Sequence, residues 1–104
     1  MVTPAQGEVW WAEAEFGRRP VLVVTRSQAT LVLNRLLVAP ITRTIRGIPT
    51  ELVLGAEEGL REPSVASFDN VSLLSKGLFI THLGTLAPHR RREFCGALSA
   101  LADC

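Results

Sequence analysis

The stretch FGRRPVLVVTR, residues 16–26, combines two adjacent cations, a proline and a run of β-branched and aliphatic residues. The run predicts a strand, and its apolar character at consecutive positions predicts burial on both faces of that strand. A proline cannot donate to a sheet ladder, so we expect Pro20 to be the first residue of the strand. Arg18 and Arg19 would then stand at the mouth of a rigid strand, a suitable position for binding an anion.

Short strands are also predicted on both sides of this stretch. They are expected in GEVWWAEAEF (7–16), RLLVAPIT (35–42, ending near Pro40), IPTELVL (48–54), SVASFDNVSLLS (64–75, one or two strands with a bend at Asp69-Asn70) and ITHLGTL (80–86). SQATLVLN (27–34) fits either a turn or a short helix. Many short strands in a small chain favour a strongly bent sheet, and a small barrel is the economical form because closure removes exposed strand edges.

The carboxyl-terminal residues form the one convincing helical pattern. Pro88 suits a first helical position, and Phe94, Leu98 and Leu101 recur at helical spacing on one face. Basic residues occupy positions 89–92, where the helix macrodipole disfavours cations, so we expect a solvated first turn. The fold class expected is therefore mostly β with a C-terminal α-helix.

Length and composition predict a single domain covering residues 1–104. A chain of 104 residues that is 47% hydrophobic can bury a core without disulfides or bound metal. Cys95 and Cys104 lie too far apart along the predicted helix to bridge, and free thiols fit a reducing cytosol. The amino terminus lacks the pattern of a signal peptide, and the apolar run at 31–41 is too short to cross a bilayer. We expect a cytoplasmic protein with no membrane contact.

Charge is unevenly distributed although the net charge is only +1. No acidic residue occurs between Glu15 and Glu51, an interval that holds six of the eleven cations. These are Arg18, Arg19, Arg26, Arg35, Arg43 and Arg46. Such a segment creates a local positive field that attracts polyanions, but solvated arginines at strand edges would give the same pattern.

Five blocks of the sequence follow one another in a characteristic order and spacing. They are GEVWW (7–11), RRPVLVVTR (18–26), VAPITRTIRGIPTEL (38–52), SVASFDNVSLL (64–74) and THLGTL (81–86), followed by the terminal helix. Together they resemble the MazF/PemK family of toxin endoribonucleases. The resemblance implies an SH3-like small barrel of the MazF/CcdB type, a homodimer, a cognate antitoxin with an acidic tail, and sequence-specific cleavage of single-stranded RNA without metal or other cofactor.

The resemblance also implies catalytic roles for Arg19, Thr42 and Asp69. A guanidinium forks onto phosphate oxygens, so charge stabilisation is the natural role of Arg19, although a plain turn arginine would look alike. The hydroxyl of Thr42 can donate to a phosphate oxygen or can cap a turn. Asp69 can accept the 2′-OH proton if burial raises its pKa, or it can form a bend with Asn70.

RNA-binding roles are expected for five further residues: Arg18, Arg26, Arg43, Arg46 and Asn70. Arginine contacts to phosphates position a strand without reading its bases. Trp10 and Trp11 offer surfaces on which bases stack, but at least one is expected in the core or an interface. His82 is expected to be structural.

Two departures from the family pattern limit what the resemblance implies. The connection between the first two strands is very short, so the RNA sequence cleaved by relatives cannot be transferred. Ser67 stands where some relatives have an arginine. Two other readings remain: a non-catalytic RNA- or protein-binding barrel, and a poison of DNA gyrase, whose family shares this barrel.

Overall fold

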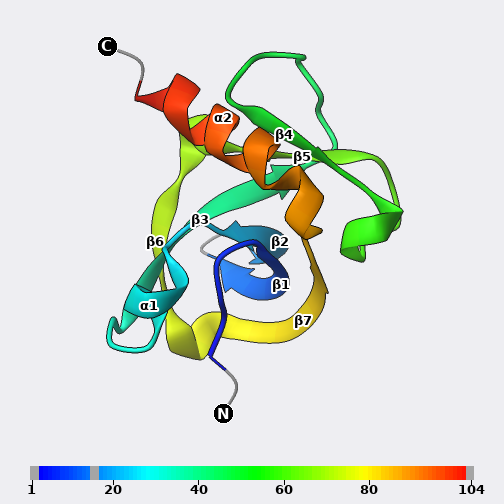
Figure 1. The fold of residues 1–104 in the computed structure, drawn as a ribbon. Helices are drawn as coiled ribbons and strands as arrows, with labels where there is room; N and C mark the ends of the chain where they lie inside the picture. Colours follow the sequence, from blue (N-terminus) through cyan, green and yellow to red (C-terminus); the bar gives the residue numbers. More distant parts are fainter. Residues whose placement is uncertain (1–2, 15–16, 103–104) are drawn as a thin grey trace.

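The computed structural model describes residues 3–14 and 17–102 and is built mainly of short antiparallel strands (Figure 1). The strands are β1 (Glu8–Ala14), β2 (Gly17–Val23), β3 (Arg35–Thr42), β4 (Glu51–Leu54), β5 (Ser64–Ser67), β6 (Ser72–Ser75) and β7 (Phe79–Thr85). The helices are α1 (Ser27–Thr30) and α2 (Arg91–Leu101), with 3₁₀ turns η1 (Ala56–Glu58), η2 (Phe68–Asn70), η3 (Lys76–Leu78) and η4 (Pro88–Arg90). The expectation of a mostly-β chain with a C-terminal helix is confirmed.

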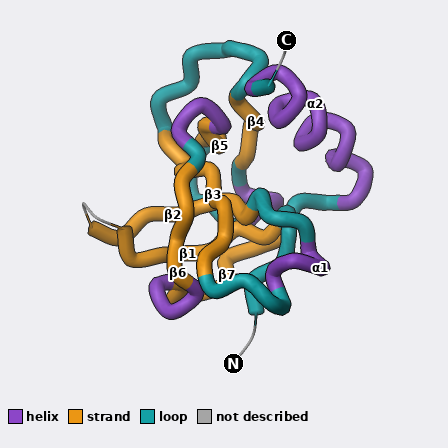
Figure 2. The backbone as a smooth tube through the Cα atoms, turned by 90° about the vertical axis from the view of Figure 1, so that its left-hand side faces the viewer, coloured by secondary structure: helices purple, strands orange, loops and turns teal. Residues whose placement is uncertain are grey.

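The strands form one curled sheet in the order β4-β5-β3-β2-β1-β7, with β6 also paired to β3. β5 and β6 both pair antiparallel with β3, and η2 interrupts them at the expected bend. Curling brings η1 against β7, so the sheet is a half-barrel in which a turn, not a strand pair, meets the last strand. Figure 2 shows α2 on one side of this sheet, next to β4.

The predicted burial of β2 on both faces is confirmed. Leu22 packs into the larger apolar cluster, which includes Phe68 of η2 and Phe94 of α2. Val21 and Val23 pack into a second cluster around Trp10, on the opposite face. The central strand thus joins two cores, which explains its continuous apolar sequence.

The expected start of β2 at Pro20 is wrong, because the strand begins at Gly17. The proline is tolerated inside the strand because β3 pairs with β2 only through Val21–Val23. Pro20 therefore lies beyond the end of that ladder, where the strand has a neighbour on one side only. The expected strand at 35–42 is confirmed as β3, which continues past Pro40 to Thr42 alongside β5.

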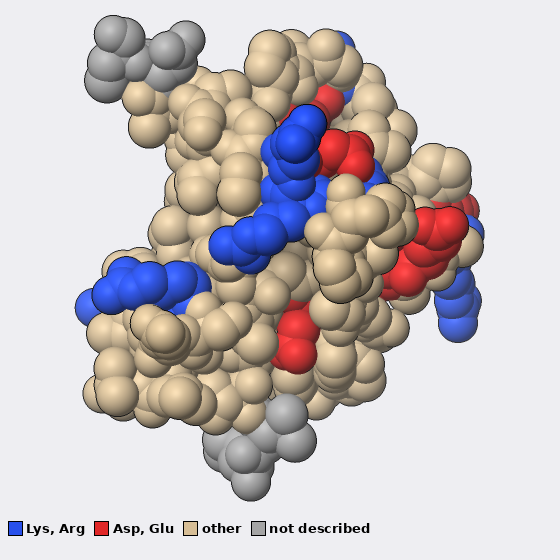
Figure 3. All heavy atoms as spheres, in the orientation of Figure 1, with Lys and Arg blue, Asp and Glu red and all other residues tan. Residues whose placement is uncertain are grey.

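The sequence predicted a solvated first turn for the C-terminal helix, and this is wrong for Arg90. Arg90 has a side chain only 14% exposed, and its guanidinium lies 3.4 Å from the carboxylate of Glu58, which is 3% exposed. Arg90 also donates to the carbonyl of Val53 at 2.7 Å and to Glu93 at 2.9 Å, and it lowers the pKa of Glu93 mainly through that hydrogen bond. Figure 3 shows cations beside acidic side chains over this end of α2.

The contact between η1 and β7 leaves no room for a side chain at two glycines. A Cβ on Gly84 would meet the carbonyl oxygen of Glu58 at 2.3 Å, and a Cβ on Gly59 would meet that of Leu83 at 2.1 Å. Gly59 also has φ +86°, which disfavours other residues. These glycines set how closely the β4–β5 connection approaches the last strand.

Two sequence-based expectations concern the ends of the chain and its connections. Cys95 lies exposed on α2 with a free thiol, whereas Cys104 is outside the described residues, as are Glu15 and Phe16 of the short first connection. Within residues 3–14 and 17–102, no helix has the length and apolar character needed to cross a membrane.

Replacing Arg90 with alanine should destabilise the fold by about 3 kcal/mol, because it leaves the buried carboxylate of Glu58 without its cation. Arg92→Ala removes the same charge from an exposed position on α2 and should change stability by less than about 0.5 kcal/mol. Urea unfolding followed by circular dichroism measures both. Equal stabilities of the two variants would show that the Glu58–Arg90 pair does not anchor the helix.

Candidate functional site

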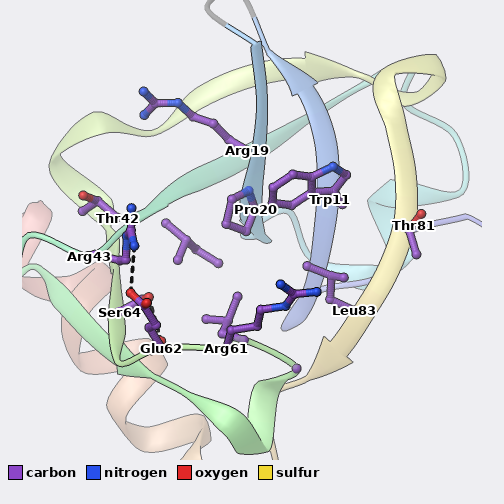
Figure 4. Close-up of a pocket in the computed structure, with 13 residues that line it drawn as sticks. Trp11, Arg19, Pro20, Thr42, Arg43, Arg61, Glu62, Ser64, Thr81 and Leu83 are labelled. Carbon is purple, nitrogen blue, oxygen red and sulfur yellow. Dashed lines mark hydrogen bonds and ion pairs between the residues drawn. The ribbon is translucent and has the colours of Figure 1, made fainter.

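A groove of about 900 Å³ opens on the concave side of the curled sheet. Its lining comes from β1, β2, β3, β7 and the β4–β5 connection (Figure 4). The lining residues are Trp11, Arg19, Pro20, Ile41, Thr42, Arg43, Gly59, Leu60, Arg61, Glu62, Ser64, Thr81 and Leu83. We call this set the groove below.

The end of the β2–β3 ladder creates one side of the groove. The last pair is Val21 with Pro40, and beyond it the two strands are no longer paired. Continuing the same register by two residues would set Arg19 opposite Thr42. Both side chains line the groove (Figure 4), so the structure brings together two of the three expected catalytic residues.

Arg18 and Arg19 have different surroundings although they are adjacent. Arg18 pairs in register with Glu13 of β1 and donates to its carboxylate at 3.2 Å. Arg19 is exposed, lines the groove and has no hydrogen-bond or ion-pair partner among the described residues. Alternation along the strand separates the two cations, and only Arg19 remains free for an anion in the groove.

Arg43, also in the groove, is not uncompensated as the acid-free segment suggested. Its guanidinium donates to Glu62 at 2.8 Å, across from β3 to the β4–β5 connection. The hydrogen bond and the charge of Glu62 raise the pKa of Arg43. Both side chains are largely exposed, so the pair adds little stability and can open for a competing anion.

The floor of the groove is a row of side chains across three strands. In the sheet register Trp11 of β1 lies between Thr81 of β7 and Pro20 of β2. Leu83, two residues after Thr81 in β7, also lines the groove. The floor is therefore mainly apolar and carries one half-exposed indole ring.

Besides Arg18, four expected site residues do not line the groove. Arg26 precedes α1, and Arg46 lies in the 43–50 loop, where its backbone N–H donates to Glu51 at 3.0 Å. Asp69 is exposed and accepts a hydrogen bond from Thr50 at 2.5 Å. Asn70 donates to Ser67 at 2.8 Å, so its amide is used inside the η2 turn.

The other candidate side chains have structural roles. Trp10 is 7% exposed, donates to Glu8 and packs edge-on against Phe79, as expected for one of the two tryptophans. His82 stacks on Trp10, and its Nε2 lies 2.8 Å from the carbonyl oxygen of Gly84. Over the described ranges, no three His, Cys, Asp or Glu side chains are grouped to hold a metal ion.

Two charged groove residues, Arg61 and Glu62, were not expected from the sequence. Both lie in the β4–β5 connection, which reads as an ordinary polar loop. The one available signal was the sequence Gly59-Leu60-Arg61 directly after Glu58. It points to the groove only once the contact between Gly59 and Leu83 of β7 is known. Together the groove residues offer cations, one carboxylate, hydroxyls and an apolar floor, which is an arrangement suited to a phosphodiester with an attached base.

The fold is that of small toxins with a curled sheet and a terminal helix. The chain is 32% identical to the structure titled Mycobacterium tuberculosis toxin MazF-mt6, with a TM-score of 0.87 over 92% of this chain and 96% of that one. It is 25% identical to an endoribonuclease in complex with its cognate antitoxin from mycobacterial species, with a TM-score of 0.85 over 95% and 94% of the two chains.

Sequence comparison gives the family. The model of the PemK-like, MazF-like toxins of type II toxin–antitoxin systems matches residues 5–101, so the chain belongs to this family. The chain is 46% identical to the probable endoribonuclease MazF5 of M. tuberculosis H37Rv, over 97% of its length and 94% of the relative. It is 40% identical to the probable endoribonuclease MazF2 of the same organism, over 95% and 98%.

Proposed function

We propose that this toxin is a sequence-specific endoribonuclease that cleaves single-stranded RNA in the groove. The observation that carries the proposal is the unpaired Arg19 beside Thr42 at the open end of the β2–β3 ladder. The relatives at 46% and 40% identity, both described as probable endoribonucleases, support the same activity.

The reaction proposed is attack of a ribose 2′-OH on the neighbouring phosphate. The P–O5′ bond breaks and the leaving O5′ takes a proton from water, which gives a 2′,3′-cyclic phosphate and a 5′-OH. Charge grows on the nonbridging oxygens in the transition state, and a preorganised donor there lowers the barrier. Arg19 supplies a two-pronged donor and Thr42 a hydroxyl donor to these oxygens. Arg43 attracts the flanking phosphate, and Arg18, Arg26 and Arg46 add attraction at longer range.

The proton acceptor assigned here is Glu62. Asp69, which the resemblance favoured, does not line the groove, whereas Glu62 is the one carboxylate among the described residues that line it. In the free protein Glu62 is held by Arg43 at 2.8 Å. A phosphate that binds Arg43 competes for this guanidinium and frees the carboxylate to accept the 2′-OH proton.

The partners proposed are a second copy of the chain and a cognate antitoxin, with the cytoplasm as the place of action. Consecutive apolar side chains stand exposed between α1 and β3, including Leu31 at 72% and Val32 at 79%. Isolated exposed apolar residues are common, but a contiguous set favours an interface. An antitoxin with an acidic, disordered tail matches the cations of the groove and would exclude RNA from it.

Cleavage of a mixed-sequence single-stranded RNA in excess EDTA tests the activity. We expect fragments whose 5′ ends accept phosphate from a kinase directly, which indicates a 5′-OH, and 3′ ends that carry the cyclic phosphate. No cleavage by the purified protein in either EDTA or Mg²⁺ would contradict the proposal, provided that the protein is folded and free of antitoxin.

Arg19→Ala should lower single-turnover cleavage by about a hundredfold or more, the scale for losing one preorganised stabiliser. Arg19→Lys should restore little of the cleavage rate, because an ammonium lacks the two parallel donors of a guanidinium. Arg18→Ala is the matched control: it removes the neighbouring cation, which Glu13 already holds, and should mainly weaken binding. The reverse ranking of Arg18→Ala and Arg19→Ala would mean that the scissile phosphate lies on the other face of β2.

Glu62→Gln should lower cleavage roughly a hundredfold, the lower range for loss of a general base, while Asp69→Asn stays within roughly threefold of wild type. Both substitutions keep side-chain shape and remove one negative charge, so they control for each other. Saturating RNA and single-turnover conditions separate the chemical step from binding. Loss of cleavage in Asp69→Asn alone would assign the proton transfer to Asp69.

Light scattering at micromolar concentration should give twice the chain mass of 11.3 kDa. Val32→Ser should shift the mass towards the monomer if the exposed 31–33 segment lies in the interface, whereas Ser72→Ala, exposed on β6, should not. A monomer for the wild-type chain would contradict the homodimer.

A further inference from the structure

The groove has two chemically different ends. Arg19, Thr42 and Arg43 gather at one end (Figure 4), where they suit phosphate. At the other end Trp11, Thr81 and Leu83 form the floor, and the side chain of Arg61 points towards Leu83 beneath Trp11 (Figure 4). The phosphate chemistry proposed above uses none of these four side chains.

Trp11 is available to a ligand in a way that Trp10 is not. Trp10 is buried, bonded to Glu8 and packed against Phe79 and His82. Trp11 is half-exposed, and among the described residues it has no aromatic neighbour and no hydrogen bond from its indole N–H. Its cross-strand neighbours, Thr81 and Pro20, restrain the ring in the sheet without covering its exposed surface.

The guanidinium of Arg61 is available to a ligand, and the backbone that carries it is held in place. Its guanidinium has no acid or carbonyl partner within the described part of the chain, unlike Arg18, Arg43 and Arg90. Two residues earlier, Gly59 lies against the backbone of Leu83 so closely that no Cβ fits. Close packing there fixes the start of the 59–63 segment relative to the floor of the groove.

We infer that Trp11 and Arg61 form a nucleobase subsite that reads a guanine next to the cleaved phosphate. The inference rests on the proposed function in one respect, namely that the ligand of the groove is single-stranded nucleic acid. An exposed indole stacks on any base, so Trp11 supplies affinity rather than selection. The guanidinium supplies selection because its parallel donors match the O6 and N7 acceptors of guanine, a pair that no other base presents.

The test measures binding of nine-residue 2′-fluoro oligouridines, which lack the nucleophilic hydroxyl, by fluorescence anisotropy. The central nucleotide is uracil, adenine, guanine, 7-deazaguanine or an abasic unit. Wild type should bind the guanine oligonucleotide roughly tenfold more tightly than the adenine one, and 7-deazaguanine should lose most of this gain because N7 is absent.

Arg61→Ala should bind guanine and 7-deazaguanine equally, whereas Arg61→Lys should keep most of the overall affinity and only part of the guanine preference, because an ammonium lacks the two parallel donors. Trp11→Ala should bind the adenine and abasic oligonucleotides within about twofold of each other, where wild type separates them roughly tenfold, because stacking does not depend on which base is present. Trp11→Leu keeps apolar bulk in the floor and should show the same loss if the alanine variant does not fold. Arg92→Ala, an exposed cation outside the groove, should leave every preference unchanged.

A guanine preference that persists in Arg61→Ala, or no guanine preference in wild type, would overturn the subsite. These outcomes are separable from failure of the proposed nuclease. Cleavage of RNA without a guanine preference would support the proposed nuclease activity and contradict the subsite. A guanine preference that depends on Trp11 and Arg61, in a protein that does not cleave RNA, would support the subsite and contradict the nuclease activity.

Discussion

The end of the β2–β3 ladder is the constraint on which the groove depends. Pro40 is in the last pair and Pro20 lies just beyond it, so neither residue can extend the ladder by donating an N–H. β2 continues alongside β1, and β3 continues alongside β5, so each strand remains supported on one side. The opening between them exposes Arg19 and Thr42 on rigid backbone without a flexible loop at either position.

The opposite wall of the groove depends on a buried ion pair and two glycines. Glu58 accepts the backbone N–H of Gly55 at 2.7 Å and faces Arg90, so it joins η1 to the start of α2. Gly59 and Gly84 then let η1 lie directly on β7. A buried ion pair is a weak source of net stability, but losing one partner is costly, so this pair specifies position. It sets where Arg61 and Glu62 stand relative to the floor.

The strands were largely predictable from local sequence, because β-branched runs and alternation report burial directly. In the strand expected at 48–54, Leu52 and Leu54 alternate with the exposed Val53, and both are buried. The limits of the strands were not predictable, since Pro20 is acceptable within β2 only because β3 ends its pairing there. Arg19 and Thr42 were identified through resemblance to a family. Arg61 and Glu62 were missed because a contact between Gly59 and Leu83, 24 residues apart, places them, and no local pattern encodes it.

The distribution of acids gives the arginines different roles. Arg18, Arg43 and Arg90 each have a carboxylate within 3.4 Å, whereas Arg19 and Arg61 have none among the described residues. Other surface cations also lack an acid partner, but Arg19 and Arg61 are set apart because their side chains line the groove, where a ligand can complete their contacts. The two arginines stand at the groove's two chemically different ends. A single-stranded nucleic acid supplies what both ends lack, because its phosphate and its base are different ligands joined by one sugar.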